Sequence, residues 1–160
     1  MDDPLVKVNE SAMKSEILIS PSVGAPETGL RVLIADKSAH MRETVRRVLA
    51  QYRNCAVVGE AETLLDAVRI ARSATANLAL LDIDLAMNEN PARLRRIAAA
   101  FPRLHVVVML NEDSDDYREA VADRWGYSCI AKDKAEIDLP TLLREPMAHL
   151  TNRGGNRPAS

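Results

Sequence analysis

The chain has 160 residues, of which 47% are hydrophobic, and its formal net charge is −2. This length suits one domain with its own core, and the nearly balanced charge gives no general attraction to nucleic acid or anionic lipid. No stretch approaches the length of a membrane span, and no long apolar region follows the acidic start as it would in a secretory signal. We therefore expect a soluble protein that resides in the cytoplasm.

Composition divides the chain into three zones. Residues 1–28 contain scattered proline and glycine, which predicts a flexible N-terminal extension. The apolar residues Ile17–Ile19 within it are consistent either with a docked edge strand or with a short apolar cluster of no structural role. Residues 29–150 carry the regular patterns of a domain, and residues 151–160 are rich in Asn, Gly and Pro, as in a tail or linker.

Strand and helix patterns alternate along the domain. Short apolar runs, typical of strands buried on both faces of a parallel sheet, lie at 32–35, 56–58, 78–81, 105–110 and 129–131. Helix-starting residues follow each run, namely Ser38, Thr63, Asn90 with Pro91, Asp113 or Ser114, and Asp138. This alternation predicts an α/β fold, in which right-handed crossovers place five helices on the two faces of a five-stranded, doubly wound parallel sheet.

Three of the apolar runs end on a charged residue. Asp36 follows the first run, Asp82 the third and Lys132 the fifth. Because the carboxyl ends of parallel strands form the ligand crevice of an open sheet, two carboxylates and one ammonium should converge at one edge. The sequence therefore predicts a site for anion transfer or cation binding.

These residues, in this βα register, resemble the receiver domain of bacterial response regulators, the CheY-like fold, over Arg31 to Leu150. The closest branch is NarL/FixJ. The resemblance implies a strand order of 2-1-3-4-5 and a role in two-component phosphorelay signal transduction. It also implies that Asp82 is the phosphoacceptor and Lys132 its cationic partner, and that Asp36, Asp82 and Asp84 contribute to a magnesium site.

One departure from the family affects this magnesium site. Lys37 stands where the family has the second member of an acidic pair. Magnesium prefers carboxylate and water ligands, and two positive charges a few ångströms apart repel. We therefore expect no cofactor beyond weakly bound magnesium. Lys37 is expected to pair with Asp36 or Asp82 in place of the metal, and the alternative is that it extends from its loop into solvent.

Two further departures affect the switch by which the family reports phosphorylation. Leu110 replaces the Thr or Ser that would hydrogen-bond a phosphoryl oxygen, and Cys129 replaces the aromatic ring that moves with it. Asn111 is a poorly placed substitute donor. The chain therefore resembles a degenerate receiver, in which a modified Asp82 lacks the usual means of reaching the rest of the domain.

Neither the remaining basic residues nor the cysteines predict a further site. Arg93, Arg95 and Arg96 form a basic patch typical of a solvated helix face, so we expect no direct contact with nucleic acid. Cys55 and Cys129 have no metal-binding spacing and are expected to be buried, reduced thiols.

Three functions remain open. The favoured one is a non-enzymatic, phosphorylation-independent module that binds a protein partner, such as a sensor kinase or regulator. The alternative is a phosphoacceptor switch at Asp82 with weakened magnesium binding, belonging to a transcriptional regulator whose helix-turn-helix output is missing. The third is a flavodoxin-like or phosphatase-like enzyme, which the absence of a Gly-rich loop after the first strand disfavours. A homodimer is compatible with the resemblance, although Pro146 should interrupt the last helix that would support it.

Overall fold

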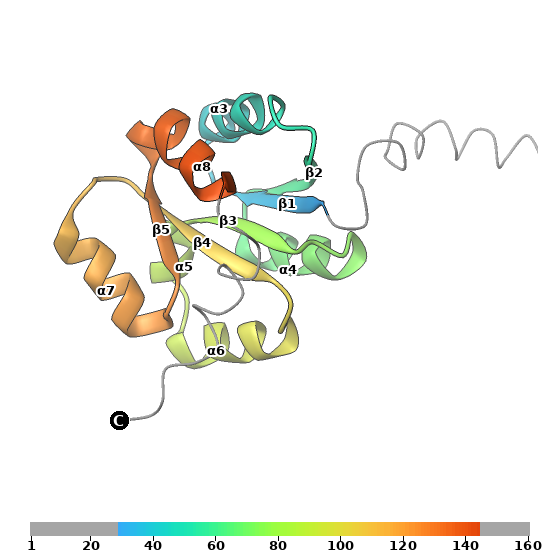
Figure 1. Cartoon of the computed structure of the whole chain (residues 1–160). Helices are drawn as coiled ribbons and strands as arrows, with labels where there is room; N and C mark the ends of the chain where they lie inside the picture. The colour runs from blue at the N-terminus through green and yellow to red at the C-terminus, as the bar shows by residue number, and fades with distance from the viewer. Residues whose placement is uncertain (1–28, 145–160) are drawn as a thin grey trace, which may run out of the picture.

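The computed structural model describes residues 29–144 and shows a five-stranded parallel sheet in the order β2-β1-β3-β4-β5 (Figure 1). The strands are β1 (Leu30–Ala35), β2 (Cys55–Ala61), β3 (Leu78–Asp82), β4 (His105–Leu110) and β5 (Ser128–Ala131). The helices are α3 (Ala39–Leu49), α4 (Leu64–Ser73), α5 (Ile83–Met87), α6 (Pro91–Ala100), α7 (Asp115–Trp125) and α8 (Ala135–Arg144), with a 3-10 turn, η1 (Lys132–Lys134), before α8. The predicted fold class and strand order are confirmed.

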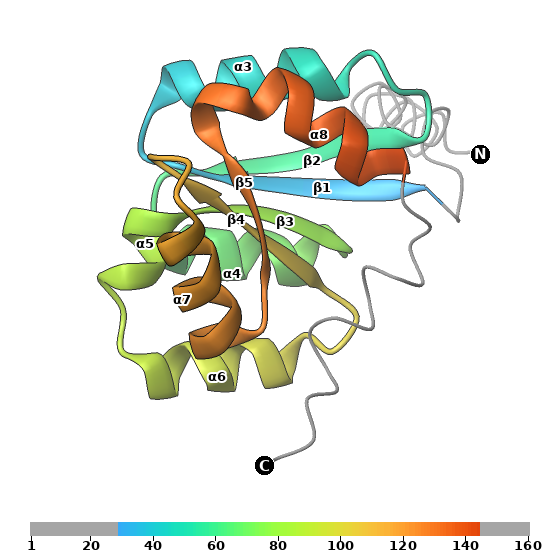
Figure 2. The same cartoon turned by 60° about the vertical axis from the view of Figure 1, so that its left-hand side comes forward.

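The sheet separates two apolar layers. On one face, α3 and α8 cover side chains such as Val32, Ile34 and Leu80, while α4 and α6 cover Leu33 and Leu81 on the other (Figure 2). Successive strand residues point to opposite faces, so an apolar run without polar alternation supplies both layers at once. This explains why the short apolar runs predicted the strands.

Local signals start three of the helices. The Ser38 side chain accepts a hydrogen bond from the backbone N–H of Met41, and Thr63 caps α4 in the same way through the N–H of Asp66. Asn90 caps α6, and Pro91 occupies its first turn. These side chains satisfy backbone N–H groups that have no partner within the helix, and they confirm the predicted starts.

The structure differs from the sequence prediction in two helices. The short helix α5, which begins directly after Asp82, was not predicted. The last helix begins at Ala135 rather than Asp138, and the Asp138 carboxylate accepts a hydrogen bond from the N–H of Ala131 instead of capping the helix. The helix continues through Pro140, which the prediction overlooked.

Some predictions concern residues that the structure does not describe. Ile17–Ile19 and Pro146 lie outside residues 29–144, as do both predicted terminal zones, so their limits stay predictions. Within residues 29–144, no helix is long and apolar enough to cross a membrane. Cys55 and Cys129 form no disulfide and are only partly buried.

Gly59 allows α4 to approach the sheet closely. The β1–β2 register shifts so that Val32 pairs with Val57 and Leu33 with Gly59, which leaves an extra residue in β2. A Cβ atom on Gly59 would lie 2.3 Å from Cγ2 of Ile70 in α4. The packing of α4 against this strand therefore requires a residue without a side chain.

We expect Gly59→Ala to lower the free energy of unfolding by about 1–3 kcal/mol, the usual effect of overpacking, as measured by urea denaturation. At an unhindered strand position the same change would be stabilising. The control is the double-mutant cycle with Ile70→Ala, which removes the clashing methyl group. Equal effects of Gly59→Ala in both backgrounds would contradict the proposed contact.

Candidate functional site

The structure brings together the three charged side chains that the sequence places at the ends of strands. Asp36 follows β1, Asp82 ends β3, and Lys132 follows β5. The two aspartates are among the few buried charged residues in the described range, with exposed fractions of 1% and 2%. Burial of two carboxylates is costly unless a positive charge accompanies them.

Lys132 supplies that charge. Its Nζ atom lies 2.8 Å from Oδ1 of Asp82 and 3.1 Å from Oδ2 of Asp36. Burial alone would lower the pKa of Lys132, but its hydrogen bonds and attraction to Asp82 and Asp36 outweigh burial and raise the pKa above the ordinary lysine value. The ammonium therefore stays protonated between the two carboxylates.

Backbone groups fix the orientation of both carboxylates. Oδ1 of Asp36 accepts a hydrogen bond of 2.8 Å from the N–H of Ser38, and Oδ1 of Asp82 accepts one of 3.1 Å from the N–H of Asp84. Asp82 is also the N-cap of α5, so the chain turns into this helix directly at the site. The site is thus held by local backbone geometry as well as by the ion pairs.

Asp84 and Asn111 lie at the exposed border of the site and contact each other. Nδ2 of Asn111 donates to Oδ2 of Asp84 over 3.1 Å. The amide that the sequence offers as a substitute phosphoryl donor is therefore engaged with a carboxylate. The Asp84 side chain is exposed, in contrast to the buried Asp82.

The predicted pairing of Lys37 with the acidic site is not found. Lys37 is exposed, and within residues 29–144 the ion pairs of Asp36 and Asp82 are made by Lys132 instead. A second ammonium beside Lys132 would be repelled at short range, and the alternative, in which Lys37 extends into solvent, agrees with its exposure. The prediction that Lys37 fills the place of a metal ion is therefore wrong.

Lys132 occupies the space between the two carboxylates that the resemblance assigns to magnesium. Lys132 lies between Asp36 and Asp82, Asp84 is turned toward Asn111, and position 37 provides a cation rather than a ligand. In the described part of the chain, no group of three His, Cys, Asp or Glu side chains is arranged to hold a metal ion. Because the contact that the family makes at position 84 is a backbone carbonyl, the weak magnesium site of Asp36, Asp82 and Asp84 stays a prediction.

Comparisons with known proteins agree with this fold. A model of the response regulator receiver domain matches residues 32–144. The chain belongs to the response regulator receiver domain family. No curated protein sequence matches it.

Solved structures of receivers share the fold. The RcsB response regulator of Salmonella typhimurium is 23% identical, with a TM-score of 0.65, and the match covers 82% of this chain and 64% of RcsB. The receiver domain of a putative NarL from Mycobacterium tuberculosis is 20% identical (TM-score 0.59; 76% and 100% covered), and that of Thermotoga maritima CheB is 21% identical (TM-score 0.61; 81% and 99% covered). This chain therefore spans about two thirds of the length of RcsB.

Compared with the family pattern, the switch positions of this receiver are apolar and packed. Leu110 has an exposed fraction of 1% and lies in a cluster with Ile83, Val108 and Val121, against which Cys129 packs. Burial raises the pKa of the Cys129 thiol to about 11, so it is uncharged at neutral pH. Neither side chain offers the hydroxyl or the aromatic ring that the resemblance implies.

Sequence reasoning missed a charged network that ties α7 to the neighbouring elements of the receiver. Arg118 in α7 donates from Nε to Asp113 over 2.9 Å and from Nη1 to the carbonyl oxygen of Cys129 over 3.2 Å. Its Nη2 atom lies 3.5 Å from Asp138 in α8, and Lys134 also pairs with Asp113. The sequence shows these residues only as parts of charged runs, because the contacts depend on how α7, β5 and α8 pack.

We expect Lys132→Met to lower the free energy of unfolding at pH 7 by roughly 3–5 kcal/mol, because it leaves two buried carboxylates without a cation. Urea denaturation measures this loss.

The free energy of unfolding of the wild-type chain should fall in alkali. The Lys132 pKa is raised by folding, so its stabilising effect is complete below the unfolded lysine value of 10.5 and is lost as the pH rises through the higher folded value. Lys37→Met is the matched control, with little expected effect at any pH because this side chain is exposed. Equal losses in the two variants would contradict the bridging role of Lys132.

Proposed function

We propose that this receiver is a phosphorylation-independent protein-interaction module rather than an enzyme. The observation that carries the proposal is the Lys132 ammonium, which pairs at once with buried Asp36 and Asp82. The ion pairs neutralise much of the site's charge within the chain itself. The resting domain then needs no divalent cation for stability.

Phosphoryl transfer to Asp82 is disfavoured by the charges of this site. The transferred group carries negative charge on its oxygens, which receivers and other phosphoryl-transfer proteins offset with a cation and fixed positive groups. Here the single ammonium of Lys132 already forms ion pairs with two carboxylates. Lys37 is exposed to solvent, which screens its charge, so it offers little compensation.

The means of reporting a phosphoryl group are also missing. Leu110 and Cys129 are held in an apolar cluster, and Arg118 fixes α7 through the carbonyl oxygen of Cys129 and through Asp113. None of these contacts involves Asp82. We infer that the surface around α7 keeps one conformation whatever the state of the aspartate.

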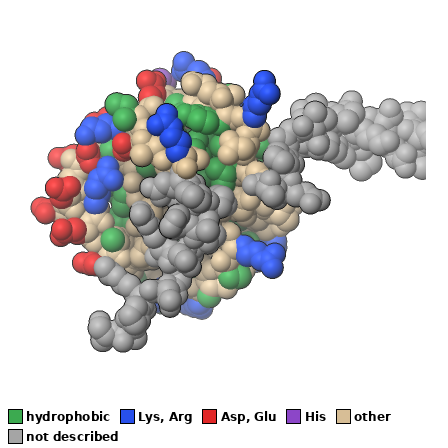
Figure 3. All heavy atoms as spheres, in the orientation of Figure 1, with side chains coloured by type: hydrophobic (Ala, Val, Ile, Leu, Met, Phe, Trp, Pro, Cys, Tyr) green, Lys and Arg blue, Asp and Glu red, His purple; other side chains and the backbone are tan. Residues whose placement is uncertain are grey.

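The outer side of α7 is the surface that we assign to a protein partner. Acidic side chains gather where α7 lies on the molecule (Figure 3), and they include Asp115, Asp116 and Glu119, all exposed. Tyr117 is 53% exposed among them. An exposed aromatic ring on a helix that also carries exposed acidic side chains suits a partner, such as a sensor kinase or regulator, that presents basic and apolar groups.

The second candidate function is a phosphoacceptor switch with weak magnesium binding, within a longer regulator that has an output domain. The retained Asp82–Lys132 pair favours it, because a phosphoacceptor needs a nearby cation. The two candidates differ in whether Asp82 must be modified. The response to beryllium fluoride and the activity of Asp82→Asn in cells distinguish the two candidates.

In a magnesium titration followed by NMR, the wild-type chain should bind weakly and give only local shifts with beryllium fluoride, a phosphoryl mimic. Lys37→Asp restores a second acid beside Asp36 and should strengthen magnesium binding by about tenfold or more, by adding an anionic ligand and removing a cation. The control is Arg47→Asp, which makes the same charge change on an exposed position of α3. Tight magnesium binding by the wild type would contradict the prediction.

Function in cells should tolerate loss of the phosphoacceptor. We expect Asp82→Asn to complement a deletion strain almost as well as the wild type, and Tyr117→Ala to complement poorly, since the ring is the apolar centre of the proposed partner surface. Immunoblotting checks that the variants accumulate equally. Leu65→Ala, at an exposed apolar position on α4, is the matched control. Loss of function in Asp82→Asn with the fold intact would favour the phosphoacceptor switch.

A further inference from the structure

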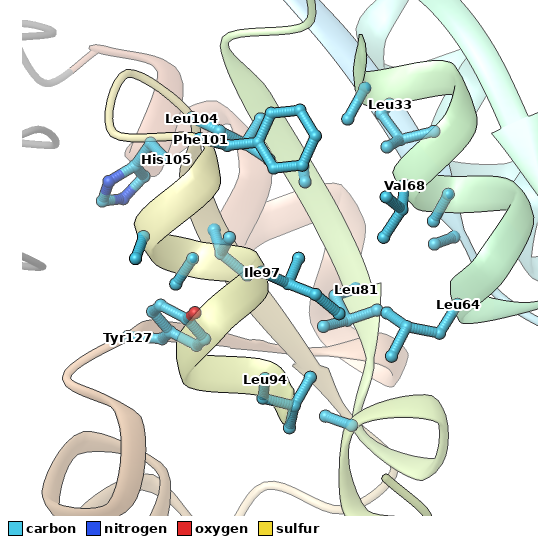
Figure 4. A pocket seen from close by; sticks show the side chains of 18 of the residues that line it. Leu33, Leu64, Val68, Leu81, Leu94, Ile97, Phe101, Leu104, His105 and Tyr127 are labelled. Atoms are coloured by element: carbon cyan, nitrogen blue, oxygen red, sulfur yellow. The ribbon is translucent and has the colours of Figure 1, made fainter. Parts of the chain in front are cut away.

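A cavity of about 350 Å³ lies between α4 and α6, over the face of the sheet formed by β1 and β3. Most of its lining side chains are apolar, and Arg103, His105 and Tyr127 also line it. Figure 4 shows Ile97 extending from α6 toward Leu81 and Leu64, with Val68 of α4 on the opposite side and Phe101 at one end. The cavity contains none of the charged residues of the Asp36–Asp82–Lys132 site.

Small side chains create this space. The residues that line it include alanines on several surrounding elements, namely Ala67 and Ala71 of α4, Ala79 of β3, Ala86 of α5 and Ala98 of α6. Protein interiors are normally packed with few voids larger than a water molecule. A cavity of roughly 150 Å³ suffices for a benzene ring, and ligand pockets typically span roughly 300–1,000 Å³. The cavity thus has the size and lining of a small-molecule site.

Arginines border the adjoining surface. A second, shallower hollow shares Val68, Ile97 and Phe101 with the cavity and adds Arg72, Arg93 and Arg96. Arg93 pairs with Glu89 at 3.2 Å, whereas neither Arg72 nor Arg96 forms an ion pair within residues 29–144. The Arg72 guanidinium lies 6.0 Å from the centre of the Phe101 ring. Two cationic groups therefore stand at the edge of an apolar cavity.

We propose that this cavity binds a small amphipathic anion. Its apolar body lies among Leu64, Val68, Leu81 and Ile97, and its acidic group, a carboxylate, sulfonate or phosphate, is held by Arg72 and Arg96. An apolar cavity with a cationic border selects this class over neutral or cationic molecules of the same size. The binding site is independent of the proposed partner surface on α7.

Decanoate, which is ionised at pH 7, is the probe. Titrated into the full chain and followed by ¹H–¹⁵N NMR, it should shift the amide signals of Leu64, Val68 and Ile97. The neutral analogue 1-decanol should bind about tenfold more weakly, because each exposed arginine contributes about threefold through a charge interaction. Shifts centred on another part of the domain, or equal affinity for the two probes, would overturn the proposal.

A first pair of variants tests the cavity. Ala98→Leu places a larger side chain among the lining residues and should weaken decanoate binding by about tenfold. Ala92→Leu makes the same change on the same helix, at an exposed position that lines neither hollow, and should leave binding unchanged. Unaltered binding in a folded Ala98→Leu chain would overturn the assignment.

A second pair tests the cationic border and does not disturb the core. The double variant Arg72→Gln/Arg96→Gln should lose about tenfold in decanoate affinity, whereas its affinity for 1-decanol should be unchanged. Arg95→Gln, which removes an exposed α6 arginine outside both hollows, should match the wild type. Equal losses for the two probes would show that the arginines act on folding and would overturn their assigned role. Binding of an acidic amphipathic peptide, but not of decanoate, would likewise overturn the small-molecule assignment.

Discussion

The ammonium of Lys132, held between the buried carboxylates of Asp36 and Asp82, is the interaction on which the rest of this receiver depends. Two carboxylates with almost no solvent exposure cannot both stay ionised without a cation nearby. That requirement fixes where β1, β3 and β5 must end relative to one another, because each strand delivers one of the three groups. The same electrostatic constraint therefore acts on the relative positions of these strand ends and on the geometry of the site.

The departures from the family pattern all affect residues that would bind the metal ion or respond to a phosphoryl group. Lys37 removes a metal ligand and leaves Lys132 to neutralise the pair. Leu110 and Cys129 turn the positions that would respond to a phosphoryl group into part of an apolar cluster, and Arg118 ties α7 to that region by hydrogen bonds that need no phosphoryl group. Under the proposed function, these departures act together on both the metal site and the switch.

The sequence predicts features that depend on residues close together in the chain better than features that depend on packing between distant segments. Apolar runs and N-cap residues act within a few positions of the chain, so the strands, three helix starts and the convergence of Asp36, Asp82 and Lys132 could be inferred. The exposure of Lys37, the contacts of Arg118 and the use of Asp138 at Ala131 depend on packing between distant segments. The cavity beside α6 could not be inferred either, because alanine spacing shows an apolar face but not whether neighbouring side chains fill the space.

The cavity and the ion-pair site share two strands. Ala35 and Leu81 line the cavity, and each directly precedes one of the buried aspartates, Asp36 and Asp82. Because protein interiors are close-packed, a ligand that occupies the cavity contacts the strand ends that carry the carboxylates. A phosphoryl group would act on these strand ends from the charged edge, whereas an amphipathic anion acts on them from the apolar face. The proposed cavity site thus gives a small molecule a route to the receiver's central strands that does not depend on phosphoryl chemistry at Asp82.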